Sequence, residues 1–395
     1  MYFFIRRKFI VGLFGDKDII DRLNILEEQN KRLIKECEEL RKSNEELKKK
    51  YDYVFSVEQR YEKNMNMCYE NLKTEVRDNK KTMDSRHEFV NKKIDGNHNA
   101  VLNKARRLEK DIKYYYYKGL HPDQYPQNLK EWYKERTGEE LNLENPTTFN
   151  EKVQWLKLYD STEFKSRLAD KYLVREFVKE KIGEEYLVPL IGVYDSFDDI
   201  DFDKLPEKFA MKTNHSSTWN LIVKDKAELD IEAAKRKFDY WLKRDYSFEY
   251  GMELHYSNIK PKIIIEKFIE NFDEEVIDYR FFCFDGKVYA IWASIGSGTQ
   301  NRKNNVYDLD WNLQPLKMGN LPNGTELEKR PDNLDKMIEI SEKLSEGISM
   351  VRVDLYEING KIQFGEMTFT PMSGCAKWNP PEYNKLYGEQ IKLPN

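Results

Sequence analysis

Leucines spaced seven residues apart near the amino terminus restrict this part of the chain to a long helix. One series is Leu26, Leu33, Leu40, Leu47 and Val54, and a second, three residues earlier in each heptad, is Leu23, Asn30, Cys37, Asn44 and Tyr51. Two such series are the d and a positions of a coiled coil, whose apolar seam packs against a partner helix. Asn30 and Asn44 at a positions favour a parallel homodimer in a fixed register.

The heptads weaken after Val54, although helical spacing continues. Residues 96–99, Gly-Asn-His-Asn, predict a break, after which the pattern resumes over residues 100–112. We therefore predict a coiled-coil stalk over residues 18–112. For residues 57–95 two interpretations remain, a helix that oligomerises or docks to a partner and a single solvated helix.

The first residues are aromatic and basic. Three cations, Arg6, Arg7 and Lys8, interrupt the apolar run of residues 1–14, so it is too short to span a bilayer and does not have the pattern of a signal peptide. Such a segment suits contact with an anionic membrane surface. The alternative is a frayed start to the following helix. We treat residues 1–17 as a separate amino-terminal segment.

Charge and cysteine content exclude several classes of protein. The 395 residues carry a formal net charge of −4, whereas a protein that binds nucleic acid without sequence preference is usually basic. The cysteines are Cys37, Cys68, Cys283 and Cys375, with no spacing typical of a zinc site or a disulfide framework. We expect the protein to belong to a reducing, cytoplasmic compartment, with or without contact at the inner face of the membrane.

The chain changes character after Tyr117, where heptads end and Trp, Pro and Gly appear. Residues 113–160 predict connecting helices, and residues 161–395 predict a catalytic domain. Two hairpins, around Asp285-Gly286 and Asn359-Gly360, indicate α+β layers rather than a doubly wound parallel sheet. The predicted strands are 187–193, 209–212, 221–223, 263–268, 278–284, 288–293, 350–357 and 361–368, and the predicted helices are 166–181, 231–243 and 334–345.

Two carboxylates and a lysine in this domain suggest a chemistry. Asp354 and Glu366 lie on opposite arms of the second hairpin, and counting from its turn places position 354 opposite about position 365 or 366, so the two carboxylates can converge. Two neighbouring acids repel unless a cation lies between them, and Mg²⁺ prefers oxygen ligands. Lys212 ends an apolar strand and is suited to a phosphate. Together they predict phosphoryl transfer from ATP with Mg²⁺.

Seven stretches of the second part resemble the ATP-grasp superfamily, and more narrowly its TupA-like (teichuronopeptide-biosynthesis) branch, which is associated with cell-surface polysaccharides. The resemblance covers residues 149–393 and implies two α+β subdomains around a nucleotide cleft. The stretches are FNEKVQWLKL (149–158), ADKY (169–172), LPEKF (205–209), FAMKTNH (209–215), DYRFFCF (278–284), VRVDLY (351–356) and FGEMTF (364–369).

The resemblance also implies roles for single residues. Lys171 and Lys212 match lysines that reach the phosphates of ATP. Glu266 lies where the family has the hinge between its subdomains, and there the backbone of Lys267 and Phe268 would hydrogen-bond the adenine. The alternative for the two lysines is that they are ordinary surface lysines, and the alternative for Glu266 is an ordinary strand end.

Asp278 and Arg280 are two residues apart on a predicted strand and therefore share a face. Asp278 is assigned to the nucleotide site. Arg280 suits a clamp on the γ-phosphate or on an acyl-phosphate, because its planar fork binds two oxygens at once. The alternative is an ion pair between the two side chains.

Two features depart from the family pattern. Thr368 stands where many relatives have a metal-binding Asn, and it is assigned to the metal together with Asp354 and Glu366; because its hydroxyl is neutral, a second Mg²⁺ is in question. The loop after Lys212 has no glycine, and the hydroxyls of Ser216 and Ser217 take the place of backbone donors. His215 is assigned to phosphate or acceptor, with a structural turn residue as the alternative. Arg302, in the loop 296–305, is predicted to lie on a mobile lid that meets an anionic acceptor, with a plain surface loop as the alternative.

The function predicted is an ATP-dependent ligase. A carboxylate would be phosphorylated by ATP, and an amine would then displace phosphate to form an amide. The acceptor would be a sugar or amino acid of a surface polysaccharide. Three alternatives remain: a glycan kinase or phosphotransferase, an enzyme associated with or acting as a glycosyltransferase, and a coiled-coil scaffold with a degenerate nucleotide domain.

Overall fold

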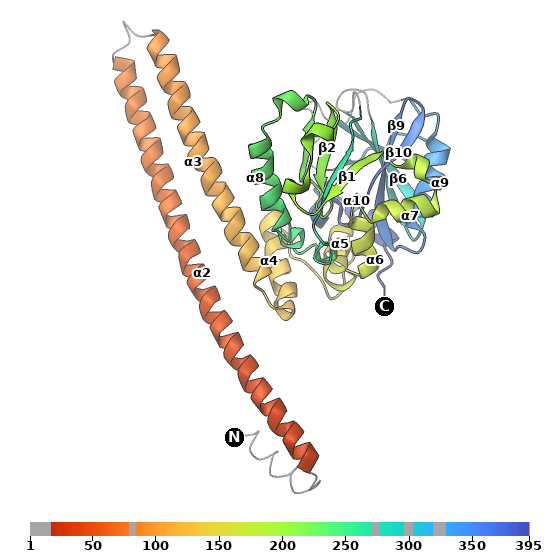
Figure 1. The fold of residues 1–395 in the computed structure, drawn as a ribbon, viewed down its shortest axis with the longest axis horizontal. Coiled ribbons are helices and arrows are strands. Elements are labelled where there is room, and N and C mark those ends of the chain that lie inside the picture. Colours follow the sequence, from red (N-terminus) through yellow and green to blue (C-terminus); the bar gives the residue numbers. More distant parts are fainter. Residues whose placement is uncertain (1–16, 79–83, 270–276, 296–302, 319–328, 395) are drawn as a thin grey trace. The chain divides into compact units, whose positions relative to one another are not determined.

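The computed structural model describes residues 17–78, 84–269, 277–295, 303–318 and 329–394. The chain divides into two compact units, Met1–Gly119 and Leu120–Asn395 (Figure 1). Within the described ranges, no helix has the length and apolar character needed to cross a membrane. The segment 1–14 and Arg302 lie outside these ranges, so the predictions for them remain predictions.

The first unit consists of two long helices, α2 (Lys17–Asp78) and α3 (Asp84–Lys118). The predicted break at residues 96–99 is wrong, because α3 runs through them. A single glycine inside a helix costs only about 1 kcal/mol relative to alanine. Apolar side chains of the two helices line a common groove, among them Val54 and Tyr61 of α2 and Val101 and Leu108 of α3.

The helix α3 covers only part of α2. A methyl group added at Gly119, which directly follows α3, would lie 3.7 Å from Oδ1 of Asn44. The rest of α2, residues 17–43, continues beyond that point (Figure 1). Two of its heptad leucines, Leu33 and Leu40, remain 56% and 62% exposed. This part of the seam is therefore available to another helix.

The second unit contains two main antiparallel sheets with helices around them, which confirms the predicted α+β layers (Figure 1). The smaller sheet has the order β1-β4-β2-β3, and the larger has the order β10-β9-β5-β6-β7. The strands of the smaller sheet are β1 (Leu190–Tyr194), β2 (Phe209–Thr213), β3 (Asn220–Val223) and β4 (Ile263–Lys267). Those of the larger are β5 (Asp278–Phe284), β6 (Lys287–Ile295), β7 (Lys303–Tyr307), β9 (Met350–Ile358) and β10 (Lys361–Thr368), and β8 (Lys317–Met318) pairs with β11 (Trp378–Asn379).

The helices of this unit differ from prediction in two ways: the helix Glu382–Gln390 was not predicted, and one predicted helix is divided. A single helix predicted over residues 166–181 is two helices, separated after Asp170. The Asp170 carboxylate accepts hydrogen bonds from the amides of Tyr172 and Leu173, at 2.8 and 3.2 Å. An Asp that bonds nearby amides competes with the helix and turns the chain. The helices are α4 (Tyr125–Thr137), α5 (Phe149–Tyr159), α6 (Glu163–Ala169), α7 (Val174–Lys181), α8 (Ile231–Leu242), α9 (Leu334–Ser345) and α10 (Glu382–Gln390).

The two predicted hairpins are present. Asp285 and Gly286 have φ of 50° and 76°, and Asn359 and Gly360 have φ of 52° and 72°. Positive φ at both central residues is the type I′ geometry that suits the twist of paired strands. The end of the predicted lid loop is instead the start of β7, which begins at Lys303.

The two faces of the larger sheet have different coverings. Phe281, Val353 and Leu355 belong to a core that includes residues of α9. On the opposite face, Phe282 and Trp292 pack against Phe149 and its neighbours. Because side chains alternate along a strand, the polar residues Asp278, Arg280 and Asp354 share this second face beyond its apolar end. That polar end forms the wall of the candidate site.

Candidate active site

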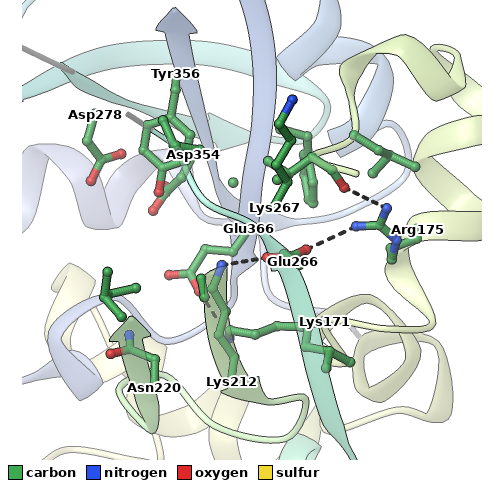
Figure 2. Close-up of a pocket in the computed structure, with 18 of the residues that line it drawn as sticks. Lys171, Arg175, Lys212, Asn220, Glu266, Lys267, Asp278, Asp354, Tyr356 and Glu366 are labelled. Atoms are coloured by element: carbon green, nitrogen blue, oxygen red, sulfur yellow. Dashed lines mark hydrogen bonds and ion pairs between the residues drawn. The ribbon is translucent and has the colours of Figure 1, made fainter. Parts of the chain in front are cut away.

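A cavity of about 300 Å³ lies in the second unit, with residues of both main sheets in its walls (Figure 2). Its described lining includes most residues predicted for the nucleotide site and two of the three predicted metal ligands. These are Lys171, Lys212, Ser217, Glu266, Lys267, Phe268, Asp278, Arg280, Asp354 and Glu366. Residues that are remote from one another in the sequence therefore share one site.

Asp354 and Glu366 are directly paired across β9 and β10. The register shifts between Phe364 and Glu366, so that Gly365 is an extra residue in β10. Without this bulge, Asp354 would pair with Gly365, and Glu366 would lie opposite Val353. Because a one-residue shift changes the face on which a side chain lies, the bulge brings both carboxylates to the cavity.

Arg352 holds the two acids together, and it had not been assigned a role from the sequence. Its Nε and Nη2 donate to the two oxygens of Asp354, at 2.7 and 2.5 Å. Nη2 also lies 3.5 Å from Oε1 of Glu366 and 3.1 Å from Oγ1 of Thr368. The signal available in the sequence was its spacing, since a residue two before Asp354 on a strand lies on the same face.

Burial and these cations act in opposite directions on the two carboxyl groups. Burial raises the pKa of Asp354, and the nearby Asp278 adds to the rise although Arg352 opposes it. Burial also acts to raise the pKa of Glu366, but Lys171 and Arg352 outweigh it and the pKa is lowered. The site therefore keeps Glu366 ionised more firmly than Asp354.

Asp278 and Arg280 form the ion pair that was one of the two predicted alternatives. Oδ2 of Asp278 accepts hydrogen bonds from Nε and Nη2 of Arg280, at 2.8 and 2.5 Å. Nε of Arg280 also lies 3.9 Å from Oδ2 of Asp354. The guanidinium group thus stands between two acids, and it lines the cavity.

Lys212 reaches the cavity from β2, and there it pairs with Glu266 at 2.7 Å (Figure 2). Glu266 also accepts a hydrogen bond from Arg175 at 3.0 Å, and Arg175 binds the carbonyl of Val188 at 2.8 Å. Arg175 lines the cavity but was missed from the sequence, because α7 shows only a surface pattern of charges. Two cations therefore flank the acid at the end of β4.

Lys171 lies in the break between α6 and α7, and its side chain crosses toward the larger sheet. Its Nζ donates to the carbonyl of Ser216 at 2.5 Å and lies 3.3 Å from Oε2 of Glu366. A lysine in this position can neutralise an anion beside Glu366. Lys171 and Lys212 thus approach the cavity from different segments.

The residues of the turn after Lys212 differ in whether they line the cavity. Ser217 lines the cavity, whereas His215 and Ser216 are not among its described lining residues. Both are 1% exposed, and the ring Nε2 of His215 lies 3.3 and 3.2 Å from the carbonyls of Trp241 and Arg244. This geometry supports the structural alternative for His215, because its ring is bonded to backbone carbonyls.

The end of β4 supplies an apolar wall. Phe268 and Ile269 line the cavity next to Lys267. The amide of Lys267 donates to the carbonyl of Pro189 at 2.9 Å, and hydrogen bonds from the backbone of Lys267 and Phe268 to adenine remain a prediction. The aromatic and aliphatic side chains remain suited to the face of a planar base.

The acid pair fits Mg²⁺ by its chemistry. Mg²⁺ is usually held by one or two carboxylates together with water and substrate phosphates. Asp354 and Glu366 supply two carboxylates, and Asp278 adds a buried oxygen, Oδ1, with no hydrogen-bond partner among the residues described. In this structure, however, Arg352 and Arg280 lie beside these acids. The described residues contain no cluster of three or more acids, histidines or cysteines that is suited to a metal ion.

Thr368 lies beside the acids without being one of the described cavity residues. Its hydroxyl donates to Oε1 of Glu366 at 3.2 Å and accepts from Arg352 at 3.1 Å. Its position therefore suits a group that orients Glu366 more than one that ligates a metal. The assignment of Thr368 to the metal remains a prediction.

Comparison with known proteins places this geometry in a family. No curated protein matches the sequence. Similar solved structures include the D-alanine–D-alanine ligase of Bacillus anthracis complexed with ATP, with 19% identity over 51% of this chain and 53% of that chain and a TM-score of 0.31. The D-alanine–D-alanine ligase of Helicobacter pylori has 16% identity over 57% of this chain and 60% of that chain, with a TM-score of 0.33.

The ATP-grasp ligase PsnB, complexed with a phosphomimetic variant of its minimal precursor, Mg and ADP, has 10% identity over 56% of this chain and 55% of that chain, with a TM-score of 0.31. The match thus spans less than two thirds of each of these three proteins, and likeness of this degree says nothing about the reaction. The family assignment depends instead on residues 151–392, more than half of the chain, which match the family described as TupA-like ATPgrasp. The chain belongs to the TupA-like ATP-grasp family.

Proposed function

We propose that this protein is an ATP- and Mg²⁺-dependent ligase that joins a carboxylate to an amine through an acyl-phosphate. The observation that carries the proposal is the direct pairing of Asp354 with Glu366 in a cavity that Lys171 and Lys212 also line. Acids for a metal and cations for phosphates in one cavity are what transfer of a phosphoryl group requires. Membership of the ATP-grasp family supports the same conclusion.

The reaction proposed has two steps. A carboxylate oxygen of the substrate attacks the γ-phosphorus, the bond from that phosphorus to the β-bridging oxygen breaks, and ADP leaves. The neutral nitrogen of an amine then attacks the acyl carbon, the bond to the phosphate oxygen breaks, and inorganic phosphate leaves while the nitrogen loses a proton. The products are an amide, ADP and phosphate.

The protein's part is mainly electrostatic. Lys212, Lys171 and Arg280 would neutralise the phosphates, and phosphoryl transfer asks for positioning and charge stabilisation more than for covalent chemistry by the protein. Phe268 and Ile269 would contact the base. Asp354 and Glu366 would hold Mg²⁺, which when bound screens the charge of the phosphates.

The acceptor is proposed from the branch of the family. TupA-like proteins are associated with cell-surface polysaccharides, and we propose that the carboxylate or the amine belongs to a sugar or amino acid of such a polymer. Incubation with candidate carboxylate and amine pairs, with ADP release and product mass as readouts, tests this. A phosphorylated glycan that accumulates without an amide would show a kinase instead.

The site itself is tested with the double variant Asp354→Asn, Glu366→Gln. We expect Mg²⁺-dependent ATP turnover and the rise in melting temperature caused by Mg²⁺ and ATP both to be lost, because a ligand stabilises only the state that binds it. The matched control is Asp198→Asn with Glu346→Gln, which removes two charges from side chains that are 72% and 73% exposed. Turnover that survives in the first double variant would contradict the assignment.

A further inference from the structure

Asp278 has an oxygen that the ion pairs of the site leave unused. The residue is 5% exposed and lines the cavity. Oδ2 accepts both hydrogen bonds from Arg280, whereas Oδ1 has no partner in the described parts of the chain. A buried acceptor without a partner is unfavourable and calls for an explanation, such as an ion that the site is built to bind.

Arg280 occupies the space between Asp278 and a second acid. In the β5–β9 register Arg280 is directly opposite Asp354, and Asp278 is two residues away on the same face of β5. The guanidinium contacts Asp278 at 2.5 Å and lies 3.9 Å from Asp354. Figure 2 draws Asp278 and Asp354 on the same side of the cavity. A cation already lies between these two carboxylates, and it belongs to the protein.

Among the described residues beside Asp354 and Glu366, Thr368 is the other candidate for a third ligand. Thr368 offers a neutral hydroxyl, which is bonded to Arg352 and Glu366. Mg²⁺ prefers charged oxygens. We propose that Asp278 serves as a third carboxylate ligand of the divalent ion, in the position now filled by the guanidinium of Arg280. This inference rests on the function proposed above.

The proposal makes Arg280 a competitor of the metal. When the ion binds between Asp278 and Asp354, the guanidinium must leave these acids. It remains on the cavity wall, where it can turn to the phosphates, because a planar guanidinium binds phosphate oxygens as readily as carboxylates. The acids then exchange one positive partner for another, and none is left uncompensated.

A competitor and a ligand differ in the sign of their effect on metal affinity. Asp278→Asn removes a ligand, and we expect the affinity for Mn²⁺, used as a probe for Mg²⁺, to fall at least about tenfold, as for groups around metal sites generally. Arg280→Gln removes the competitor, so its affinity for Mn²⁺ should equal or exceed that of the natural protein. If Asp278 only held Arg280 in place, both variants would weaken binding alike.

The experiment measures free Mn²⁺ by electron paramagnetic resonance with the full-length protein and no nucleotide, because Arg280 would also contact the phosphates of ADP, and a separate titration measures ADP binding. Circular dichroism checks that each variant is folded, and Thr368→Val is the matched control for the alternative ligand. Should Asp278→Asn not fold, Arg280→Gln alone decides, because weaker binding in that variant contradicts the proposal.

Failure of the inference can be told apart from failure of the proposed function. If the natural protein binds neither Mn²⁺ nor ADP, the function falls. If it binds both, and Asp354→Asn with Glu366→Gln abolishes Mn²⁺ binding while Asp278→Asn leaves it unchanged, only the role of Asp278 is overturned. A loss confined to Thr368→Val would assign the third position to the hydroxyl.

Discussion

His215 and His255 illustrate how single buried residues tie stability to pH. Burial lowers the pKa of His215 to about 4. Burial, aided by Lys165 and Lys157, lowers that of His255 to about 3. In an unfolded chain both would titrate near pH 6.5. Between pH 6.5 and pH 4 the unfolded state binds more protons than the folded state. The contribution of the two histidines to the free energy of unfolding is therefore fully present above pH 6.5 and is lost as the pH falls toward 4.

We therefore expect the urea midpoint of unfolding to fall steadily between pH 6.5 and 4. His255→Gln should show a shallower fall, because one of the two titrating groups is gone. Nε2 of His255 has no hydrogen-bond partner in the ranges that the structure describes, so the substitution breaks no hydrogen bond of this nitrogen with them. Identical slopes for the variant and the natural protein would contradict the assignment of this pH dependence to His255.

At the scale of single elements, the bulge in β10 is the feature on which the acid pair depends. A methyl group added at Gly365 would lie 2.9 Å from the ring of Tyr356 and 3.0 Å from the carbonyl oxygen of Asp354. The second contact involves backbone, which gives way less easily than a side chain. We expect Gly365→Ala to displace Glu366 from Asp354 and to cost about 1–3 kcal/mol, as overpacking does.

The measurement is the melting temperature with and without Mg²⁺ and ATP. Gly365→Ala should fold but lose at least half of the stabilisation by the ligands. Lys361→Ala, at the exposed start of the same strand, is the control and should keep it. A full ligand response in Gly365→Ala would show that the bulge does not set the position of Glu366.

At the scale of the whole molecule, the two units suggest a division between association and chemistry. The cavity is lined only by residues of the second unit in its described parts. In the first, the exposed Leu33 and Leu40 continue a heptad seam beyond the point that α3 reaches. Glu36 and Arg41, at g and e positions, would pair across a parallel dimer. We propose that residues 17–43 of α2 bind the same segment of a second copy.

Substitution of both leucines, Leu33→Asp with Leu40→Asp, should convert a dimer into a monomer in analytical ultracentrifugation. The rise in melting temperature with Mg²⁺ and ATP should be unchanged, because the cavity is in the other unit. Lys35→Asp with Lys42→Asp, both at f positions away from the seam, is the matched control and should remain dimeric. A natural protein that sediments as a monomer would refute the dimer.

Local signals predicted many elements of this chain correctly. The apolar run of β4, the turn pairs Asp285-Gly286 and Asn359-Gly360, and the helix over Leu334–Ser345 all depend on neighbouring residues, and the structure contains each of them. The short strands β8 and β11 were not predicted, because two-residue strands have no periodicity. The start of β7 was assigned to a loop because residues 296–305 have no apolar periodicity, although Asn304 and Asn305 are buried there.

The sequence by itself determined that helices and hairpins form and that two acids lie on the two arms of one hairpin, since each of these depends on spacing along the chain. The bulge at Gly365, which the spacing did not reveal, decided that the two acids face each other. Only the tertiary structure decided which charges meet. The pairing of Arg280 with Asp354, of Arg352 with Glu366 and of Lys212 with Glu266 depends on the register between separate strands. No local pattern carries that register, because burial and the packing of both sheets set it together.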